Sequence, residues 1–78
     1  MHIFVGNLSS LTTREHLSRL FIKFGKVLSV KIETNTSTGH SLGFGYVEMD
    51  NIPGSIAIRE LDSRNFMNHY LEVIEAEA

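Results

Sequence analysis

The sequence predicts an α+β fold of the order β-α-β-β-α-β, in which two helices cover one face of a four-stranded antiparallel sheet. Two observations predict this arrangement. In four short segments the side chains divide between two faces at every second residue, which is the period of a strand. In two longer segments apolar residues recur three and four positions apart, which is the period of a helix. The order of these segments is that of a split βαβ unit.

The first predicted strand spans residues 2–6. Ile3 and Val5 lie on one face of it, because successive side chains of a strand alternate. His2 and Phe4 therefore point to the other face. We expect the aliphatic face to be the one that packs against the helices.

The first helix is expected directly after this strand and a short loop. Thr12 has the position of an N-cap, and Glu15 follows three residues later, as in a capping box. Gly25 is typical of the position just past a helix C-terminus. The residues spaced at i, i+3, i+4 and i+7, which predict one buried stripe, are Leu17, Leu20, Phe21 and Phe24.

The second strand is predicted at residues 27–33 and the third at residues 44–49, joined by the polar loop 34–42. Val30 and Ile32 of the second strand face inward, and Lys31 faces outward. In the third strand the alternate positions facing the helices are Gly45, Val47 and Met49, where Gly45 gives room for close packing of strand and helix. The outward residues of the third strand are Phe44, Tyr46 and Glu48.

The second helix begins at the turn of residues 50–53, where Pro53 is tolerated in the first helical turn. Its buried stripe consists of Gly54, Ala57, Ile58 and Leu61. Residues 62–69 are expected to form a turn region, and residues 70–75 the fourth strand. The complete pattern is that of a ferredoxin-like sandwich, and a chain of 78 residues predicts a single domain over residues 1–78.

The composition limits the classes of function. The absence of cysteine excludes disulfides, thiolate metal sites and cysteine nucleophiles, and it fits a reducing compartment, so we expect a cytoplasmic protein. The apolar segment at residues 3–5 is too short to enter a membrane. The formal net charge is −2, whereas nucleic-acid-binding proteins usually carry a basic surface. The charge therefore argues against strong non-specific binding, but base stacking depends on exposed rings more than on net charge.

Three aromatic residues are expected to meet on the uncovered face of the sheet. The first and third strands of this fold lie side by side at its centre, so Phe4, Phe44 and Tyr46 should be neighbours. An exposed aromatic cluster usually indicates a binding partner. The opposite faces of both strands are already filled with aliphatic residues, which disfavours core packing as the role of these rings.

Two segments carry a resemblance to a known family. Residues 3–8 (IFVGNL) resemble the six-residue ribonucleoprotein motif, and residues 42–49 (LGFGYVEM) resemble the eight-residue one. These are the motifs of the RNA-recognition motif family. The resemblance implies that the rings of Phe4 and Phe44 stack on successive bases and that Tyr46 packs against the sugars between them.

The chain also departs from the family's pattern. The eight-residue motif usually begins with Arg or Lys, which would contact a phosphate, but this chain has Leu42. Glu72 is expected on the open face, where it would repel phosphate. Lys31 is the one strand cation on that face, so it is the first candidate for a backbone contact. Candidates for polar or stacking contacts at the rim are Asn7, Ser9, His2, His40, His69 and Tyr70.

The sequence disfavours other kinds of site. The four histidines fall on different elements without paired ligand spacing, so we expect no metal site. Gly43 and Gly45 do not open a helix, so we expect no phosphate-binding loop or cofactor. No nucleophile elbow is present, and a small ferredoxin-like enzyme such as an acylphosphatase would need a Gly-rich anion loop with its Arg. We therefore expect a protein that is not an enzyme.

The sequence thus predicts a module that binds short single-stranded RNA by base stacking, with roughly micromolar affinity. Single-stranded DNA stays open as a ligand, as does weak self-association. The alternative is a protein-binding module of the same fold, favoured by Leu42 and Glu72 but disfavoured by the three retained aromatics. A short chain that starts at Met1 is also compatible with a bacterial single-domain member of the family.

Overall fold

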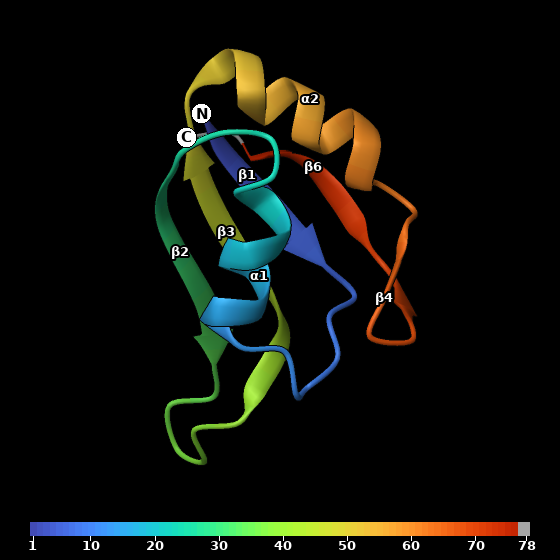
Figure 1. Cartoon of the computed structure of the whole chain (residues 1–78). Helices are drawn as coiled ribbons and strands as arrows, with labels where there is room; N and C mark the ends of the chain where they lie inside the picture. The colour runs from blue at the N-terminus through green and yellow to red at the C-terminus, as the bar shows by residue number, and fades with distance from the viewer. Residues whose placement is uncertain (77–78) are drawn as a thin grey trace.

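The computed structural model describes residues 1–76 and has the predicted ferredoxin-like arrangement. The main sheet has the strand order β2-β3-β1-β6, and all its neighbouring strands are antiparallel. Both helices lie on the same face of this sheet (Figure 1). The elements of this layer pair are β1 (His2–Gly6), α1 (Arg14–Phe21), β2 (Val27–Thr34), β3 (Ser41–Met49), α2 (Asn51–Leu61) and β6 (Glu72–Ala76).

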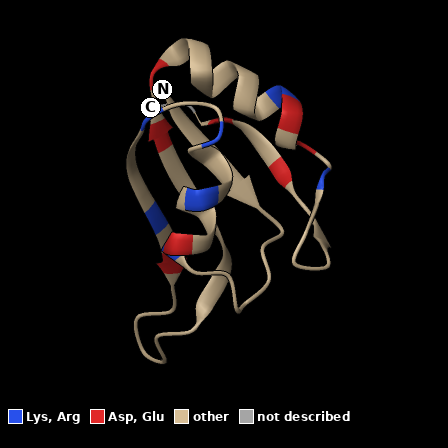
Figure 2. Ribbon diagram, viewed as in Figure 1, with Lys and Arg blue, Asp and Glu red and all other residues tan. Residues whose placement is uncertain are grey.

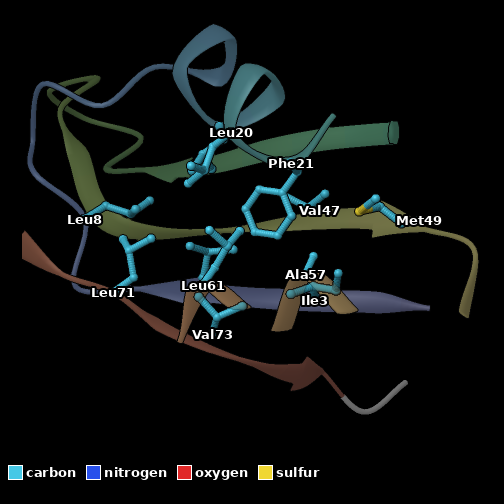
Figure 3. Close-up of a cluster of buried hydrophobic side chains, with 12 residues drawn as sticks. Ile3, Leu8, Leu20, Phe21, Val47, Met49, Ala57, Leu61, Leu71 and Val73 are labelled. Atoms are coloured by element: carbon cyan, nitrogen blue, oxygen red, sulfur yellow. The ribbon is translucent and has the colours of Figure 1, made fainter. Parts of the chain in front are cut away.

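The hydrophobic core fills the space between the helices and the sheet (Figure 3). The side chains of Ile3, Val5 and Val47 are fully buried on the inner face of the central strands. The helices contribute their predicted stripes to the same cluster, including Phe21 and Leu61. Full burial of such side chains is worth about 1.5–3 kcal/mol each, which fixes the parity of each strand and thereby the residues that point outward.

The first helix starts one residue later than predicted. Thr13, and not Thr12, is the N-cap: its hydroxyl accepts a hydrogen bond from the backbone N–H of His16, and Nδ1 of His16 accepts one from the backbone N–H of Thr13. Thr12 is instead buried, with its hydroxyl 3.4 Å from the sulfur of Met67. Either of the two adjacent threonines could act as the N-cap. Because Thr12 is buried, Thr13 takes this role. Phe24 lies beyond the helix end, although it still packs against the core.

The boundaries near the C-terminus also differ from the prediction. Tyr70 does not begin the fourth strand but belongs to a small hairpin, β4 (Asn65–Phe66) paired with β5 (His69–Tyr70). Its two central residues, Met67 and Asn68, both have positive φ (53° and 66°), as a type I′ turn requires. The edge strand β6 then begins at Glu72. The hairpin turn carries no glycine, so the usual sequence signal for it is missing.

The β2–β3 hairpin has a shorter loop than predicted. β2 extends to Thr34 and β3 begins at Ser41, so the loop comprises residues 35–40. The side-chain carbonyl oxygen of Asn35 accepts hydrogen bonds from the backbone N–H groups of Ser37 and Thr38. This local network organises the loop and lets the two strands pair almost to its ends.

Candidate functional site

The open face of the sheet carries one row of side chains across all four strands. In the observed register Tyr46 of β3 lies opposite Phe4 of β1 on one side and Lys31 of β2 on the other. Phe4 in turn lies opposite Ile74 of β6. Their inward neighbours Ile3, Val5 and Val47 on the central strands are buried, so the row faces away from both helices. The structure therefore brings together aromatic residues from strands that are about forty positions apart in the sequence.

Phe44 completes a cluster of three rings, called here the aromatic platform (Phe4, Phe44 and Tyr46). The ring centroids of Phe4 and Phe44 are 5.8 Å apart with planes inclined by 31°. Tyr46 stands nearly edge-on to both rings, 5.8 Å from Phe4 at 67° and 6.3 Å from Phe44 at 88°. These are ordinary geometries for interacting aromatic pairs. All three side chains are only half-buried, so the platform keeps surface free for a ligand.

Gly6 leaves room for the ring of Phe4 beside the end of β1. A Cβ atom at this position would lie 2.7 Å from Cε2 of Phe4, closer than such atoms approach in proteins. Any larger residue at this position would push the ring aside. The glycine therefore helps to bring Phe4 within contact distance of Phe44.

A second row of side chains runs beside the first, toward the other end of the strands. It consists of His2, Glu48 and Ser29, which lie opposite one another on β1, β3 and β2. The hydroxyl of Ser29 donates a 3.1 Å hydrogen bond to Oε1 of Glu48. Nε2 of His2 lies 3.9 Å from the same oxygen. His2, predicted as a contact at the rim, is therefore next to a carboxylate on the open face.

Lys31 is on the open face as predicted, but it has an acidic neighbour. Its ammonium nitrogen lies 3.3 Å from Oε1 of Glu33, two residues along the same strand. The Lys31 side chain is 71% exposed, and an ion pair so well solvated contributes little to stability. Lys31 can therefore turn toward another anion at small cost. Figure 2 shows that Lys and Arg are scattered over the chain among Asp and Glu.

Asn7 and Tyr70 are in contact beside the end of β1. The contact joins the side chain of Asn7 to the backbone of Tyr70. The side-chain amide of Asn7 donates a 2.7 Å hydrogen bond to the backbone carbonyl oxygen of Tyr70. Asn7 has a positive φ of 58°, which asparagine tolerates better than most residues. The ring of Tyr70 is 68% exposed and has no ring contact with the platform within residues 1–76. Asn7 thus has a structural role in joining β1 to the hairpin.

Two residues of this face were not predicted as parts of the site. Ile74 is 47% exposed beside Phe4 and extends the apolar surface of the row to the edge strand. Glu48 was placed on the outward face, but its pairing with Ser29 could not be derived from the sequence. The outward direction of Ile74 follows from strand alternation in β6 once its neighbour Val73 is known to be buried. The Glu48–Ser29 pair depends instead on a register shift between Val27 and Ser29.

Other kinds of site have little support in the described part of the chain. Among residues 1–76 no three His, Cys, Asp or Glu side chains are grouped so that they could hold a metal ion. No helix in this range is long and apolar enough to cross a membrane. An open depression of about 590 Å³ lies at the start of α2 and is lined by Met1, Leu28, Ile52 and, at its border with the open face, Glu48. None of the three platform rings lines it.

Comparisons with known proteins agree with this geometry. The family model described as "RNA recognition motif" matches residues 3–72. A Nostoc protein named "Putative RNA-binding protein RbpE" is 39% identical over 97% of this chain and 78% of its own length. The crystal structure of RNA binding protein PG1 is 40% identical, with a TM-score of 0.94 over 97% of this chain and 93% of that one. The structure of a Sex-lethal protein/RNA complex is 26% identical, with a TM-score of 0.93 over 99% of this chain and 47% of that one.

Proposed function

Because the chain belongs to the RNA recognition motif family, we propose that it binds short single-stranded RNA on the open face of its sheet by stacking bases on the aromatic platform. The observation that carries the proposal is the cluster of Phe4, Phe44 and Tyr46, which is half-buried on a face that no helix covers. Each stacked base contributes roughly 1–3 kcal/mol, as judged by alanine substitution. The mechanism is binding without chemical conversion of the ligand.

The charges of the same face support a modest affinity. Lys31 is accompanied by Glu33, and Glu48 and Glu72 are further carboxylates on the outward side of their strands. Few phosphates can be neutralised there, so few counterions are released and the dependence on salt is shallow. We expect a dissociation constant of about micromolar order, which corresponds to roughly −8 kcal/mol.

The resemblance assigns the two stacked bases to Phe4 and Phe44, and Tyr46 to the intervening sugars. The rings of Phe4 and Phe44 are inclined by 31°, the smallest angle among the three ring pairs, and this supports the division. A second division has support too, because Phe4 and Tyr46 lie directly opposite each other in one cross-strand row. In that division the two bases stack on Phe4 and Tyr46, and Phe44 contacts the sugars. Both divisions use the same platform, and RNA hexamers that lack a single base can separate them.

The first test is a two-dimensional NMR titration of the whole chain with a mixed-sequence RNA hexamer, at low and physiological salt. Shifts centred on Phe4, Phe44 and Tyr46 support the proposal, and Phe4→Ala should weaken binding about tenfold or more. Ile22→Ala is the matched control, since this exposed apolar residue lies at the end of α1 on the helical side. Absence of shifts on the sheet even at low salt would refute RNA binding at this face.

We also propose that the chain forms one domain, that it acts in the cytoplasm, and that its ligand is RNA in preference to single-stranded DNA. The same titration with a DNA hexamer of equal sequence tests this preference, because only RNA offers a 2′-hydroxyl. Weak self-association would appear as concentration-dependent shifts in the absence of nucleic acid.

A second candidate function is docking of a protein. It has support from exposed aliphatic side chains, since Leu42 is 52% exposed next to the platform and Ile52 is 77% exposed on α2. Phe44→Ala separates the two functions. RNA binding should fall by about one stacking contribution, whereas docking of a protein on the helices should survive this change.

A further inference from the structure

Glu48 has an unusual place for an acidic residue on a surface that is to meet RNA. It lies two residues beyond Tyr46 on β3, and its partner His2 lies two residues before Phe4 on β1. Two residues of a strand span about 7 Å, so the carboxylate lies next to the platform, at the distance of an adjoining base edge. A negative charge at this point opposes phosphate but suits a hydrogen-bond donor.

The carboxylate of Glu48 is held in place and keeps acceptor capacity. Oε1 accepts the hydrogen bond from the Ser29 hydroxyl and has Nε2 of His2 at 3.9 Å. Within residues 1–76, Oε2 has no hydrogen-bond partner, and the side chain is 39% exposed. An ionised carboxylate only accepts hydrogen bonds. One oxygen is therefore free to receive a donor from a ligand lying over the platform.

Bases differ in what they offer to such an oxygen. Cytosine, adenine and guanine each carry an exocyclic amino group, and a carboxylate that accepts from the cytosine amino group is a known mode of base readout. Uracil has no amino group, and its one N–H lies between two carbonyl oxygens that would face the carboxylate. Glu48 should therefore favour the three amino-bearing bases by attraction and disfavour uracil by repulsion.

We propose that Glu48, oriented by Ser29 and His2, selects an amino-bearing base at the position beside the aromatic platform and discriminates against uracil. The inference rests on the proposed function, since it concerns the same open face and names the class of RNA that this face takes. It gives a role to an acidic residue that would otherwise only weaken binding.

The test compares hexacytidylate with hexauridylate by NMR titration of the intact chain at neutral pH. The unmodified chain should bind hexacytidylate about tenfold more tightly, the value of one hydrogen bond to a charged group. Glu48→Gln should remove most of this preference, because an amide can donate to a uracil carbonyl as readily as it accepts from an amino group. Glu72→Gln is the matched control, since it removes an equal charge from an exposed residue on the outward side of β6.

The outcomes separate the inference from the proposed function. Glu72→Gln should raise the affinity for both hexamers equally and leave their ratio unchanged. If Glu48→Gln does the same, Glu48 acts only as a repelling charge and the inference is overturned. Equal binding of both hexamers to the unmodified chain, with shifts at Phe4 and Tyr46, would also overturn it while leaving RNA binding intact. Failure of both hexamers to shift any sheet residue would refute the proposed function itself.

Discussion

The side-chain amide of Asn7 donates a 2.7 Å hydrogen bond to the backbone carbonyl oxygen of Tyr70, across 63 positions of the sequence. This bond ties the end of β1 to the β4–β5 hairpin, next to the edge strand β6. The backbone of Asn7 has a left-handed conformation, with a φ of 58°. The position therefore requires a residue that tolerates positive φ and a side chain that donates this hydrogen bond. Two substitutions can separate these requirements.

Asn7→Gly keeps the left-handed backbone and removes the hydrogen bond, so it should lower the free energy of unfolding by about 1 kcal/mol. Asn7→Ala adds the cost of a left-handed conformation and should lower it by about 2 kcal/mol. Urea denaturation of both variants measures the difference. Equal losses would contradict the backbone part of this explanation. A loss of RNA affinity in Asn7→Gly, without loss of structure, would identify Asn7 as a ligand contact as well.

Leu42 stands where the related motif begins with a basic residue, and it is 52% exposed. Leu42→Arg should therefore add one phosphate contact, raise the RNA affinity at low salt, and steepen the plot of log affinity against log salt by about 0.7. Fluorescence anisotropy at several salt concentrations measures this slope. Ile22→Lys is the control, because it places a new cation on the helical side. If Ile22→Lys steepens the salt dependence of the affinity equally, the effect of Leu42→Arg comes from net charge and not from a phosphate contact at this position.

Much of this face follows from strand parity. Burial of Ile3 and Val47 fixes which way Phe4 and Tyr46 point, because side chains of a strand alternate between two faces. The platform was therefore predictable from the apolar pattern of two strands, and its existence did not depend on any loop. The ion pair of Lys31 with Glu33 was predictable on the same ground, since residues two apart share a face.

Other features depend on information that the local pattern does not contain. The cap of α1 at Thr13 is decided by burial of Thr12 under the hairpin turn. The hairpin itself uses Met67 and Asn68 with positive φ, a pair without the usual turn glycine. Gly45 was expected to make room for a helix, but its neighbour is the backbone of β2. Such contacts follow from register and tertiary packing.

Gly45 provides a direct test of this packing. A Cβ atom there would collide with the backbone carbonyl oxygen of Lys31 and lie 3.1 Å from Cα of Ile32. Backbone atoms cannot move aside as a flexible side chain can, so Gly45→Ala should destabilise the fold by about 3 kcal/mol. Thermal unfolding should occur about 15 °C lower. Gly39→Asn is the control, because a Cβ atom at this loop position would meet no atom within 4 Å beyond the adjacent residues, and asparagine tolerates its positive φ.

Glu15 provides a prediction on pH. The pKa of its carboxyl lies below the ordinary value of 4.5, chiefly because its own backbone N–H donates to the carboxylate and secondly because Thr13 does. A lowered pKa in the folded state means that the ionised form stabilises the fold above pH 4.5. This stabilisation is lost as the pH falls through the folded-state pKa. Glu15→Gln should thus be less stable than the unmodified chain at neutral pH but not in acid.

An NMR titration of the Glu15 side chain measures this pKa directly. Thr13→Ala removes the second of the two hydrogen bonds, so it should move the pKa of Glu15 upward, toward 4.5, while leaving the first cause in place. An unchanged pKa in this variant would show that Thr13 acts on the helix only as its N-cap.

RNA that lacks a single base can show which rings of the platform stack on bases. Hexamers with one abasic position keep the sugar and phosphate but lack a base to stack. If Phe4 and Phe44 stack the bases, Phe44→Ala should cost about tenfold in affinity for the intact hexamer and much less once the base above that ring is absent. Tyr46→Ala should then cost the same with both ligands, because its sugar contact remains. The reverse pattern would assign the second base to Tyr46 and the sugars to Phe44, as their places in the cross-strand register also permit. Tyr46→Phe keeps the ring and should bind like the unmodified chain in either case.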